Sequence, residues 1–483
     1  MGRLARILAA AFGRAPQVTP TAPGAQRRVV RGRYDAAQTT DDNRRHWAMA
    51  DGLSADAAAS PLVRRILRNR ARYEVANNSY ARGAVLTAAN YCVGTGPRLQ
   101  LLGLARQDDA RAVERAFADW ALAVDLGERL RVMRTAQIED GEVFALLTRN
   151  PGLDSPVQLD LRAIEADQVA TPDPVRLAPN AIDGIVFDAW GNPVEYHVLR
   201  RHPGDSGGLN RDFDRIPAVD VLHLFRPDRP GQRRGIPELT PAIPLFAQLR
   251  RYTLAVLAAA ETAADFAGIL YTDAPAGGEA DPVEPMDTVE LQKRVLTTMP
   301  CGWKLGQVHA EQPTTTFPDF VHQILAEILR CLLMPYTIGV GDSSSSNFSS
   351  AKLDTHVWIK AITVDQARLR SRVLDPLFKA WIREAILIEG FLPQRLRSIG
   401  TDWSHQWFWD GFEHIDPLKE ANAQAIRLAN HTSTLADEYA RRGQDWEGQI
   451  RQRAREKALL TELGLTSAEV QPNTKPEEEP VDV

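Results

Sequence analysis

The sequence predicts a mainly helical α+β fold, and three observations support this prediction. First, residues 317–334 and 349–390 place apolar side chains at helical spacing, with a short polar segment between them. Second, several short runs have the apolar content or alternation of β-strands: residues 142–147, 185–187, 194–198 and 219–225. Third, a chain of 483 residues that is 44% hydrophobic has ample material for more than one folded unit.

Composition excludes several classes of protein. The formal net charge of -5 and the pI near 6.1 lack the basic excess of a protein that binds double-stranded DNA tightly. Cys92, Cys301 and Cys331 are far apart and form no CxxC pair, which favours a reducing compartment over a disulfide framework or a structural zinc site. The most apolar run, residues 254–260, is too short for a transmembrane helix, so we expect no membrane association.

Both ends of the chain have the composition of disordered segments. Residues 1–33 contain seven arginines and no acidic residue, which predicts a disordered basic arm; a secretory signal is the less favoured alternative. Residues 466–483 contain three prolines and a run of three glutamates, which predicts a disordered acidic tail.

The first half of the chain mixes helices and strands. Residues 61–93 have the pattern of one long helix, and residues 108–124 that of another. The first helix carries five arginines, which we interpret as a solvated face in preference to a subunit or DNA contact: Arg64, Arg65, Arg68, Arg70 and Arg72. The GxG at residues 94–96 lacks the strand and helix of a dinucleotide site. Residues 185–187 and 194–198 flank turn residues and predict a β-hairpin.

The second half contains a helix, an insertion, a second helix, a loop and a long helix. Residues 240–268 predict an alanine-rich helix that packs closely on a neighbour, and residues 272–318 form a compact insertion with one periodic piece at 289–299. After the helix at 317–334, two glycines and four serines predict a mobile loop. The last helix begins at Ser349 or Ser350 and is interrupted by Pro376. About 40 helical residues span roughly 60 Å, which is too long for the interior of a compact domain.

The remaining residues predict a small core and further helices. Trp403 and the aromatic residues at 407–409 have the pattern of core residues. Three helical stretches follow, beginning at Pro417 and covering residues 435–442 and 444–463.

No strong catalytic signature is present. The chain lacks P-loop, HExxH and GxSxG motifs and paired Cys/His clusters. A nucleophilic role for one of the four serines at 343–346 is disfavoured, because no strand-turn-helix elbow sets a serine against a base. A metal site at His405 and His414 is also disfavoured, because the nearby acids do not share a helical face with them: Asp402, Glu413 and Asp416. We therefore predict no catalytic residue, no metal and no cofactor.

Several segments together resemble the lambda-type phage portal proteins, also called the head-tail connector family, from about Tyr34 to Leu465. In the N-terminal half, the motifs are RYDAA at 33–37 with Trp47, RNRAR at 68–72, NNSYARGA at 77–84, VGTG at 93–96 and EDGE at 139–142. The long block consists of IPA at 216–218, LHLFRP at 222–227 and RPGQRRGIP at 229–237. The later motifs are MPY at 334–336, NFSSAK at 347–352 and DPLKE at 416–420. The family usually has Tyr and Arg in place of Phe348 and Lys352, and a Gly-Val-Pro turn in place of residues 333–335.

The resemblance implies a phage portal fold with wing, stem, clip and crown regions, in which typically twelve copies form a ring. After the basic arm (1–33), it implies that residues 34–238 form a mixed α/β wing and residues 239–270 and 318–335 the two stem helices. Residues 271–317 are then the clip, 336–348 a tunnel loop and 349–390 a long kinked helix of the wing. Residues 391–414 connect wing to crown, 415–465 form a helical crown, and 466–483 are the acidic tail.

The resemblance also implies the function and partners of such a ring. Double-stranded DNA is expected to pass through the channel at one capsid vertex, past a tunnel loop formed by Gly341, Asp342, Ser343, Ser344, Ser345, Ser346 and Asn347. Expected partners are other copies of the chain, the terminase large subunit, major capsid and scaffold proteins, and head-tail connector proteins. The expected location is the virion, with the host cytoplasm during assembly.

Two other classes of function stay open at this point. The arginine-rich helix and basic arm are compatible with a nucleic-acid-processing enzyme or its accessory, which requires an active site. A mixed α/β binding protein accounts for the strands but not for a 60 Å helix beside an exposed polar loop.

Overall fold

The computed structural model describes residues 35–102, 106–171, 180–205, 212–265, 269–271, 304–306, 317–344, 347–398, 403–411 and 417–465. The predicted basic arm (1–33), the periodic piece at 289–299 and the predicted acidic tail (466–483) lie outside these residues. The chain divides into two compact units, residues 1–54 and 55–483. The described part of the first unit contains a short 3-10 helix, η1 (Asp35–Ala37), and turns around Trp47, whose ring contacts that of His46.

The second unit begins with α2 (Ala55–Ala58), α3 (Pro61–Asn77) and α4 (Ser79–Val93). The single helix predicted for residues 61–93 is therefore wrong. Asn78 leaves helical geometry, with φ -128° and ψ 117°, and its side chain accepts hydrogen bonds from the backbone N–H groups of Tyr80 and Ala81. Because an asparagine cap satisfies the first free N–H groups of a helix, it starts α4 as a separate element.

Two β-sheets follow helices α5 (Gln107–Ala123) and α6 (Leu126–Asp140). The antiparallel three-stranded sheet has the order β3-β2-β8, from β2 (Glu142–Arg149), β3 (Leu159–Ile164) and β8 (Val221–Phe225). The four-stranded sheet has the order β4-β5-β6-β7, from β4 (Ala181–Ile182), β5 (Ile185–Phe187), β6 (Pro193–Leu199) and β7 (Phe213–Pro217). The antiparallel pairing of β5 with β6 confirms the predicted hairpin. Short 3-10 turns, η2 (Ala166–Gln168) and η3 (Ala218–Asp220), precede the four-stranded sheet and β8.

A third, two-stranded sheet joins distant parts of the second unit. Strand β1 (Arg98–Leu101) pairs antiparallel with β11 (His405–Phe408), so that Leu99 lies opposite Trp407. Trp403 and Trp407 are buried in the largest core, together with Phe117, Trp120 and Trp381. This burial confirms the predicted core role of these two tryptophans.

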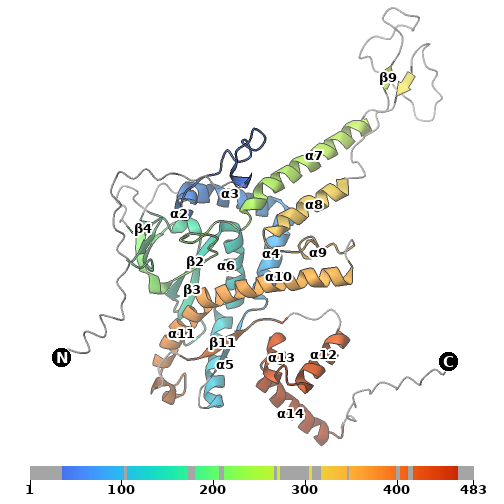
Figure 1. Ribbon diagram of the computed structural model, residues 1–483. Helices are drawn as coiled ribbons and strands as arrows, with labels where there is room; N and C mark the ends of the chain where they lie inside the picture. Colours follow the sequence, from blue (N-terminus) through green and yellow to red (C-terminus); the bar gives the residue numbers. More distant parts are fainter. Residues whose placement is uncertain are drawn as a thin grey trace, which may run out of the picture. The chain divides into compact units, whose positions relative to one another are not determined.

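Helices α7 and α8 lie side by side (Figure 1). The turn η4 (Thr240–Ala242) leads into α7 (Ile243–Asp265), and α8 covers Phe317–Arg330. The Tyr252 ring of α7 contacts the rings of Phe317 and Phe320 in α8. Strands β9 (Ile269–Tyr271) and β10 (Lys304–Gly306) pair antiparallel at the ends of the inserted segment. The helix-insertion-helix order predicted from the sequence is therefore present.

The long helix is continuous from Phe348 to Leu387 but changes its winding. It consists of α10 (Phe348–Leu369), a π-helical turn η5 (Arg370–Leu374) and α11 (Asp375–Leu387). Pro376 lies in the first turn of α11, where its missing N–H and fixed φ are tolerated. The helix is not broken at Pro376, where the sequence predicted an interruption; its winding changes just before that residue, over Arg370–Leu374. Trp358 and Ile362 of α10 are buried in a second core with residues of α4, α7 and α8.

The C-terminal part contains the 3-10 turn η6 (Gln394–Ser398), α12 (Pro417–Ala429), α13 (Leu435–Arg441) and α14 (Trp446–Glu462). These bounds agree with the three helical stretches predicted beyond residue 416. In the described part of the chain, no helix combines the length and the apolar content that crossing a membrane requires.

Candidate functional site

The seven residues predicted to line a channel, 341–347, lie in the segment between α8 and α10 and directly precede α10 (Figure 1). Residues 341–344 and Asn347 are exposed, whereas Ser345 and Ser346 lie outside the described residues. The prediction of a loop throughout 336–348 is wrong at both ends. Residues 336–339 form a helical turn, α9 (Tyr336–Gly339), and α10 already begins at Phe348. Pro335 precedes α9 with φ -64° and ψ 149°, a conformation that starts a new turn.

The near side of the segment is fixed to α8. Leu333 adopts a left-handed conformation, with φ 56°, and the Met334 N–H returns to the Leu329 carbonyl at 3.1 Å. A Cβ on Gly339 would overlap the Leu329 side chain. The Tyr336 ring also lies 4.0 Å from the ring of His322 in α8, measured between centroids. α9 is therefore packed against α8, and the exposed part begins after it.

The exposed part has a local structure of its own. Gly341 has φ 79°, which a residue with a side chain adopts only with strain. The Ser344 N–H donates to a carboxylate oxygen of Asp342 at 2.9 Å. Hydrogen bonds from the side chain and the backbone of Ser344 lower the pKa of Asp342, so this carboxylate is ionised at neutral pH. Between Arg330 and Lys352 the sequence has this one acid and no Lys or Arg.

At its C-terminal end the loop leads into α10, and Asn347 is the N-cap residue of that helix. The Asn347 side-chain oxygen accepts the Ser350 N–H at 2.8 Å, and the Ser350 hydroxyl donates to the Asn347 carbonyl at 3.0 Å. Because Asn is among the best N-cap residues, the first turn of α10 is closed locally. Ser349 or Ser350 was predicted as this cap, so the cap lies two or three residues earlier than predicted.

The described loop residues do not form a nucleophilic site. The hydrogen bonds of Ser344 and Ser350 are made to Asp342 and Asn347, and neither involves a histidine. A serine nucleophile needs a base within hydrogen-bond reach. The described part of the loop therefore offers exposed hydroxyls and one carboxylate, a surface that presents no positive charge to an anion.

An ion network fixes α10 to the rest of the unit. Arg134 of α6 donates to Glu238 at 2.7 Å and to Asp365 of α10 at 2.7 Å. Burial alone would raise the pKa of Glu238, but the Arg134 guanidinium outweighs it and holds that pKa below its ordinary value. The Gln366 side-chain amide also donates to the Cys92 carbonyl at 3.1 Å. Sequence reasoning missed this network, since its members are more than 100 residues apart.

The predicted solvated arginine face on α3 is wrong for three of its five members. Arg64 pairs with Asp183, Arg68 with Asp167 at 2.9 Å, and Arg72 with Asp140 at 2.6 Å, whereas Arg65 and Arg70 are exposed. Arg64 and Arg68 are 1% and 4% exposed. A signal was present in the sequence: Arg64, Arg68, Ala71 and Val75 share one helical face, and the two apolar members mark it as the buried face.

These arginines belong to a second buried network, which includes Glu142 of β2 and His223 of β8. Both carboxylate oxygens of Glu142 accept from Arg234 at 2.9 Å, and one lies 3.0 Å from His223 Nε2. Burial would raise the pKa of Glu142, but Arg234 and His223 together hold it well below its ordinary value. Burial lowers the pKa of His223, which the hydrogen bond to Glu142 opposes. The network is far from the loop in sequence and joins α3 to the sheets.

Two groups of residues were candidates for a cation site, and their described members already have other partners. His405 lies 3.1 Å from Asp375 and 2.8 Å from the Trp403 carbonyl, whereas Asp402, Glu413, His414 and Asp416 lie outside the described residues. Glu165, Asp167 and His202 have ligand atoms close together. The Arg72 guanidinium already contacts Glu165 at 3.0 Å and Asp167 at 3.1 Å. An arginine thus supplies the positive charge that a metal ion would bring.

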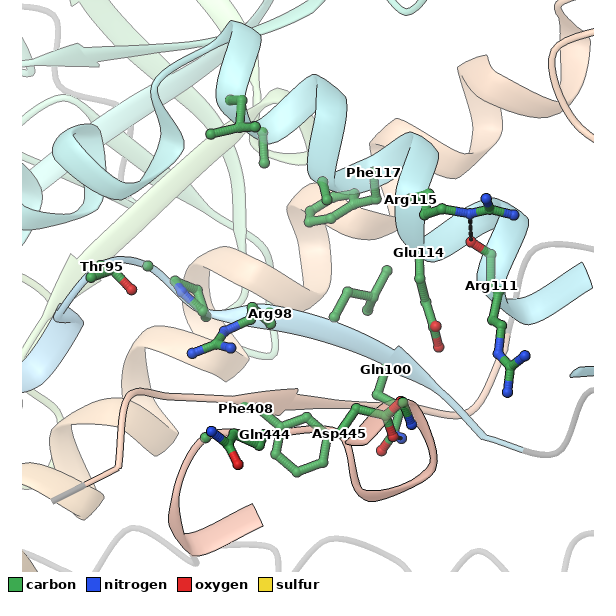
Figure 2. Close-up of a pocket in the computed structure, with 18 of the residues that line it drawn as sticks. Thr95, Arg98, Gln100, Arg111, Glu114, Arg115, Phe117, Phe408, Gln444 and Asp445 are labelled. Atoms are coloured by element: carbon green, nitrogen blue, oxygen red, sulfur yellow. Dashed lines mark hydrogen bonds between the residues drawn. The ribbon is translucent and has the colours of Figure 1, made fainter. Parts of the chain in front are cut away.

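A pocket of about 970 Å³ lies between β1, α5 and the segment that joins α13 to α14 (Figure 2). Its lining includes Phe117 and Phe408, which lie on opposite sides of β1, together with the arginines Arg98 and Arg111. Glu114 accepts the Leu101 N–H at 2.7 Å, and burial raises the pKa of this carboxyl group. Sequence reasoning missed this pocket, because the residues that β11 and α14 contribute to it are more than 280 positions away from those of β1 and α5.

Comparisons with known proteins give a consistent result. The model of the family described as "Phage portal protein, lambda family" matches residues 41–361. The "Probable portal protein" of Halomonas phage phiHAP-1 is 25% identical over 83% of this chain and 81% of its own length. "Portal protein B" of Escherichia phage lambda is 22% identical over 85% of this chain and 87% of its own length.

A solved structure, "Neck of empty GTA particle computed with C6 symmetry", covers 74% of this chain and 87% of its own chain. It is 15% identical, with a TM-score of 0.43.

Proposed function

This chain belongs to the lambda family of phage portal proteins, and from that premise we propose that it forms a closed ring at one capsid vertex. In this proposal double-stranded DNA enters and leaves the head through the centre of the ring. The observation that carries the proposal is the family match, which spans residues 41–361 and so includes α7, α8, the loop and α10 as far as residue 361.

We propose that the regions expected from the sequence have the corresponding roles. Residues 34–238 form the wing together with the long helix. Helices α7 and α8 are the two stem helices, and residues 271–317 form the clip. The pairing of β9 with β10 supports a clip that leaves and returns at one place, since it brings residues 269–271 and 304–306 together. Helices α12–α14 are the crown.

The loop from Gly341 to Asn347 is proposed to face the channel. The lack of Lys and Arg in the loop supports this role. Each phosphate neutralised by a Lys or Arg would add salt-dependent affinity for DNA, and such affinity would slow DNA that must slide through the channel. The exposed residues 341–344 present Asp342 and two serine hydroxyls. Asp342 repels phosphate, and the hydroxyls bind it weakly, so DNA passes without being gripped.

A ring of typically twelve copies requires two different, complementary faces on each copy. Such head-to-tail contacts form a closed ring only when each copy is rotated by the right angle relative to the next.

The further partners in this proposal are the terminase large subunit during packaging, major capsid and scaffold proteins during head assembly, and head-tail connector proteins afterwards. The protein is then a structural component of the virion, assembled in the host cytoplasm, and is not an enzyme. A nucleic-acid-processing enzyme is the alternative, but among the described residues no serine-histidine pair at the loop favours it.

The ring is tested by native mass measurement and electron microscopy of the purified full chain. We expect closed rings with a central channel. A stable monomer or dimer under all assembly conditions would refute the portal proposal.

The loop is tested by deleting Ser343–Ser346. We expect rings to form as in the wild type, and packaging or retention of DNA to be impaired. The matched control replaces the same four serines by alanine, which preserves the length and neutrality of the loop and should leave packaging intact. If the deletion prevents ring formation, the loop is structural and its proposed place in the channel is wrong.

A further inference from the structure

The pocket of Figure 2 runs along one edge of strand β1. Its lining includes every residue from Thr95 to Gln100, of which the last three belong to β1. Because successive side chains of a strand point to opposite faces, a pocket on one face is lined by every second residue. The unbroken run therefore places the pocket along the edge of the strand. Figure 2 shows β1 between α5 on one side and Gln444 and Asp445 on the other.

This edge of β1 has no strand beside it in the described part of the chain, because β1 pairs only with β11. The Leu102 N–H donates to the carbonyl of Ser404, the residue opposite it, at 2.7 Å. Hydrogen-bonded pairs alternate along an antiparallel ladder, so the backbone groups of Leu99 and Leu101 point away from β11. The Leu101 N–H donates to the Glu114 carboxylate at 2.7 Å, whereas no such side chain meets the Leu99 N–H among the described residues. The edge thus offers backbone groups to an added strand.

The pocket also carries positive charge that no carboxylate of the described residues neutralises. Two of the arginines in its lining, Arg98 and Arg111, already pair with carboxylates. Arg115 of α5 donates to the Arg111 carbonyl at 3.2 Å. Neither Arg115 nor Arg455 of α14 has a carboxylate partner in the described part of the chain.

The acids in the lining do not supply this missing partner. Glu114 accepts the Leu101 N–H, and Asp445 accepts two N–H groups at the start of α14. Asp108 lies two helical turns before Arg115 and forms no ion pair with it. The pocket therefore suits an extended peptide with acidic side chains, which would pair with β1 through its backbone.

The acidic tail of this chain has a segment of that kind, the run Glu477–Glu479 between Pro476 and Pro480. Proline fixes its own φ, and the residue before a proline favours an extended backbone, so the sequence is biased toward the conformation of a strand. The three glutamates keep the N–H groups that pairing with a strand requires. A segment so poor in apolar residues does not fold alone, and the edge of β1 supplies the partners that it lacks. The basic arm at residues 1–33 does not fit instead, because it would add seven arginines to an arginine-lined pocket.

The tail is long enough to reach the pocket. Gly448 and Arg455 both line it and are two turns apart on α14, so this helix runs along the pocket. From Arg455 to Leu465 the chain moves away by at most about 20 Å. An extended return over that distance takes about six residues, and residues 466–476 provide more than that number.

We propose that Glu477–Glu479 bind along the edge of β1 as an added strand of the same chain, with their carboxylates beside Arg115 and Arg455. The ligand of this pocket is thus an extended acidic peptide. The bound run holds α14 to β1 and α5, in addition to polar contacts such as that from Gln100 to Asp445 at 3.0 Å. The inference concerns one copy of the chain and does not depend on the proposed ring.

Hydrogen exchange of the full chain, resolved to single amides of β1, tests whether the edge is covered. The Leu99 amide should exchange at least about tenfold more slowly in the wild type than in E477K/E478K/E479K, whose lysines are repelled from the pocket. The Gln100 amide, which faces β11, should be equally protected in both chains and serves as the internal control. The variant E469K reverses an acid outside the run and should behave like the wild type.

Three results of this experiment would overturn the proposal. Fast exchange of the Leu99 amide in the wild type means that the edge is open. Slow exchange in E477K/E478K/E479K means that another segment covers it. Protection that is lost when the chain is diluted would assign the bound run to a neighbouring copy, and so would remove it from its proposed place in the same chain.

A pair of cysteine variants tests the position of the run directly. Gln449 lines the pocket, whereas Ala454 is an exposed residue of α14 that does not. Under mild oxidation, the intramolecular disulfide of Q449C/E478C should form at least about tenfold faster than that of A454C/E478C, because a bound run is concentrated beside the pocket. Gel mobility without reductant measures both rates. Equal rates would refute this inference, since a tail that moves freely reaches both positions, and would leave the portal proposal intact.

Discussion

Removing the negative charge of Glu238 should destabilise the folded unit strongly, because it leaves the Arg134 guanidinium in a buried site with half of its partners. Arg134 and Glu238 are 4% and 2% exposed, and their atoms approach to 2.7 Å. The substitution Glu238→Gln preserves the size of the side chain and replaces an ionised acceptor by a neutral amide. Arg134 retains Asp365, which is itself only partly buried.

The magnitude follows from the burial. Breaking a buried ion pair by removing one partner costs about 3–5 kcal/mol, and the remaining bond to Asp365 places the expected loss at the lower end, about 3 kcal/mol. The control is Glu128→Gln, which removes a carboxylate that pairs with Arg131 but is 52% exposed. Exposed pairs contribute about 0–1 kcal/mol, so this variant should unfold almost like the wild type.

Equilibrium denaturation in urea at neutral pH measures both variants, and a pH series gives a second check. The pKa of Glu238 is lowered in the folded state, so its contribution is present above the unfolded pKa, near 4.5, and is lost as pH falls through the folded pKa. Wild type and Glu238→Gln should therefore converge on acidification below pH 4.5. A neutral-pH difference no larger than that of Glu128→Gln would refute the reasoning that this network anchors α10.

Three further predictions concern the loop, the backbone and the second network. Asn347→Ala should cost about 1 kcal/mol of stability by removing the cap of α10, whereas Ser349→Ala should be nearly neutral; urea denaturation of both variants measures this. Gly83→Ala in α4 meets open space and should stabilise by roughly 0.5–1 kcal/mol, whereas Gly141→Ala should destabilise, because Gly141 has φ 89° and its new Cβ would meet the Ile236 backbone. The pKa of His223 is lowered on folding, so stability should fall as pH drops below 6.5, where the unfolded imidazole gains a proton first. His223→Gln should flatten this part of a Tm-versus-pH curve, and an unchanged slope would contradict the assignment.

The sequence by itself determined most of the local structure. Helical spacing identified α8 and the long helix, the composition of 341–347 identified an exposed segment without positive charge, and the apolar runs identified β2, the β5–β6 hairpin and β8. These features depend on side-chain periodicity and on residues that are close in the chain, which a single sequence displays directly. Short interruptions were harder to predict. Asn78 starts a new helix because its side chain caps α4. Residues 336–339 form a helical turn that follows Pro335 and packs against α8, a contact that the sequence does not display.

Only the tertiary structure decided which distant residues meet. The pairing of β1 with β11, the contact of Arg134 with Glu238 and Asp365, and the burial of Arg64 against Asp183 join residues about 100 to 300 positions apart. The sequence of a helix does not show whether one of its arginines faces water or a buried carboxylate. That depends on which distant element packs over the arginine. For the same reason the loop could be predicted from the sequence, whereas the contacts that fix its two ends could not. On one side α9 packs against α8, and on the other side Arg134 binds Asp365 of α10.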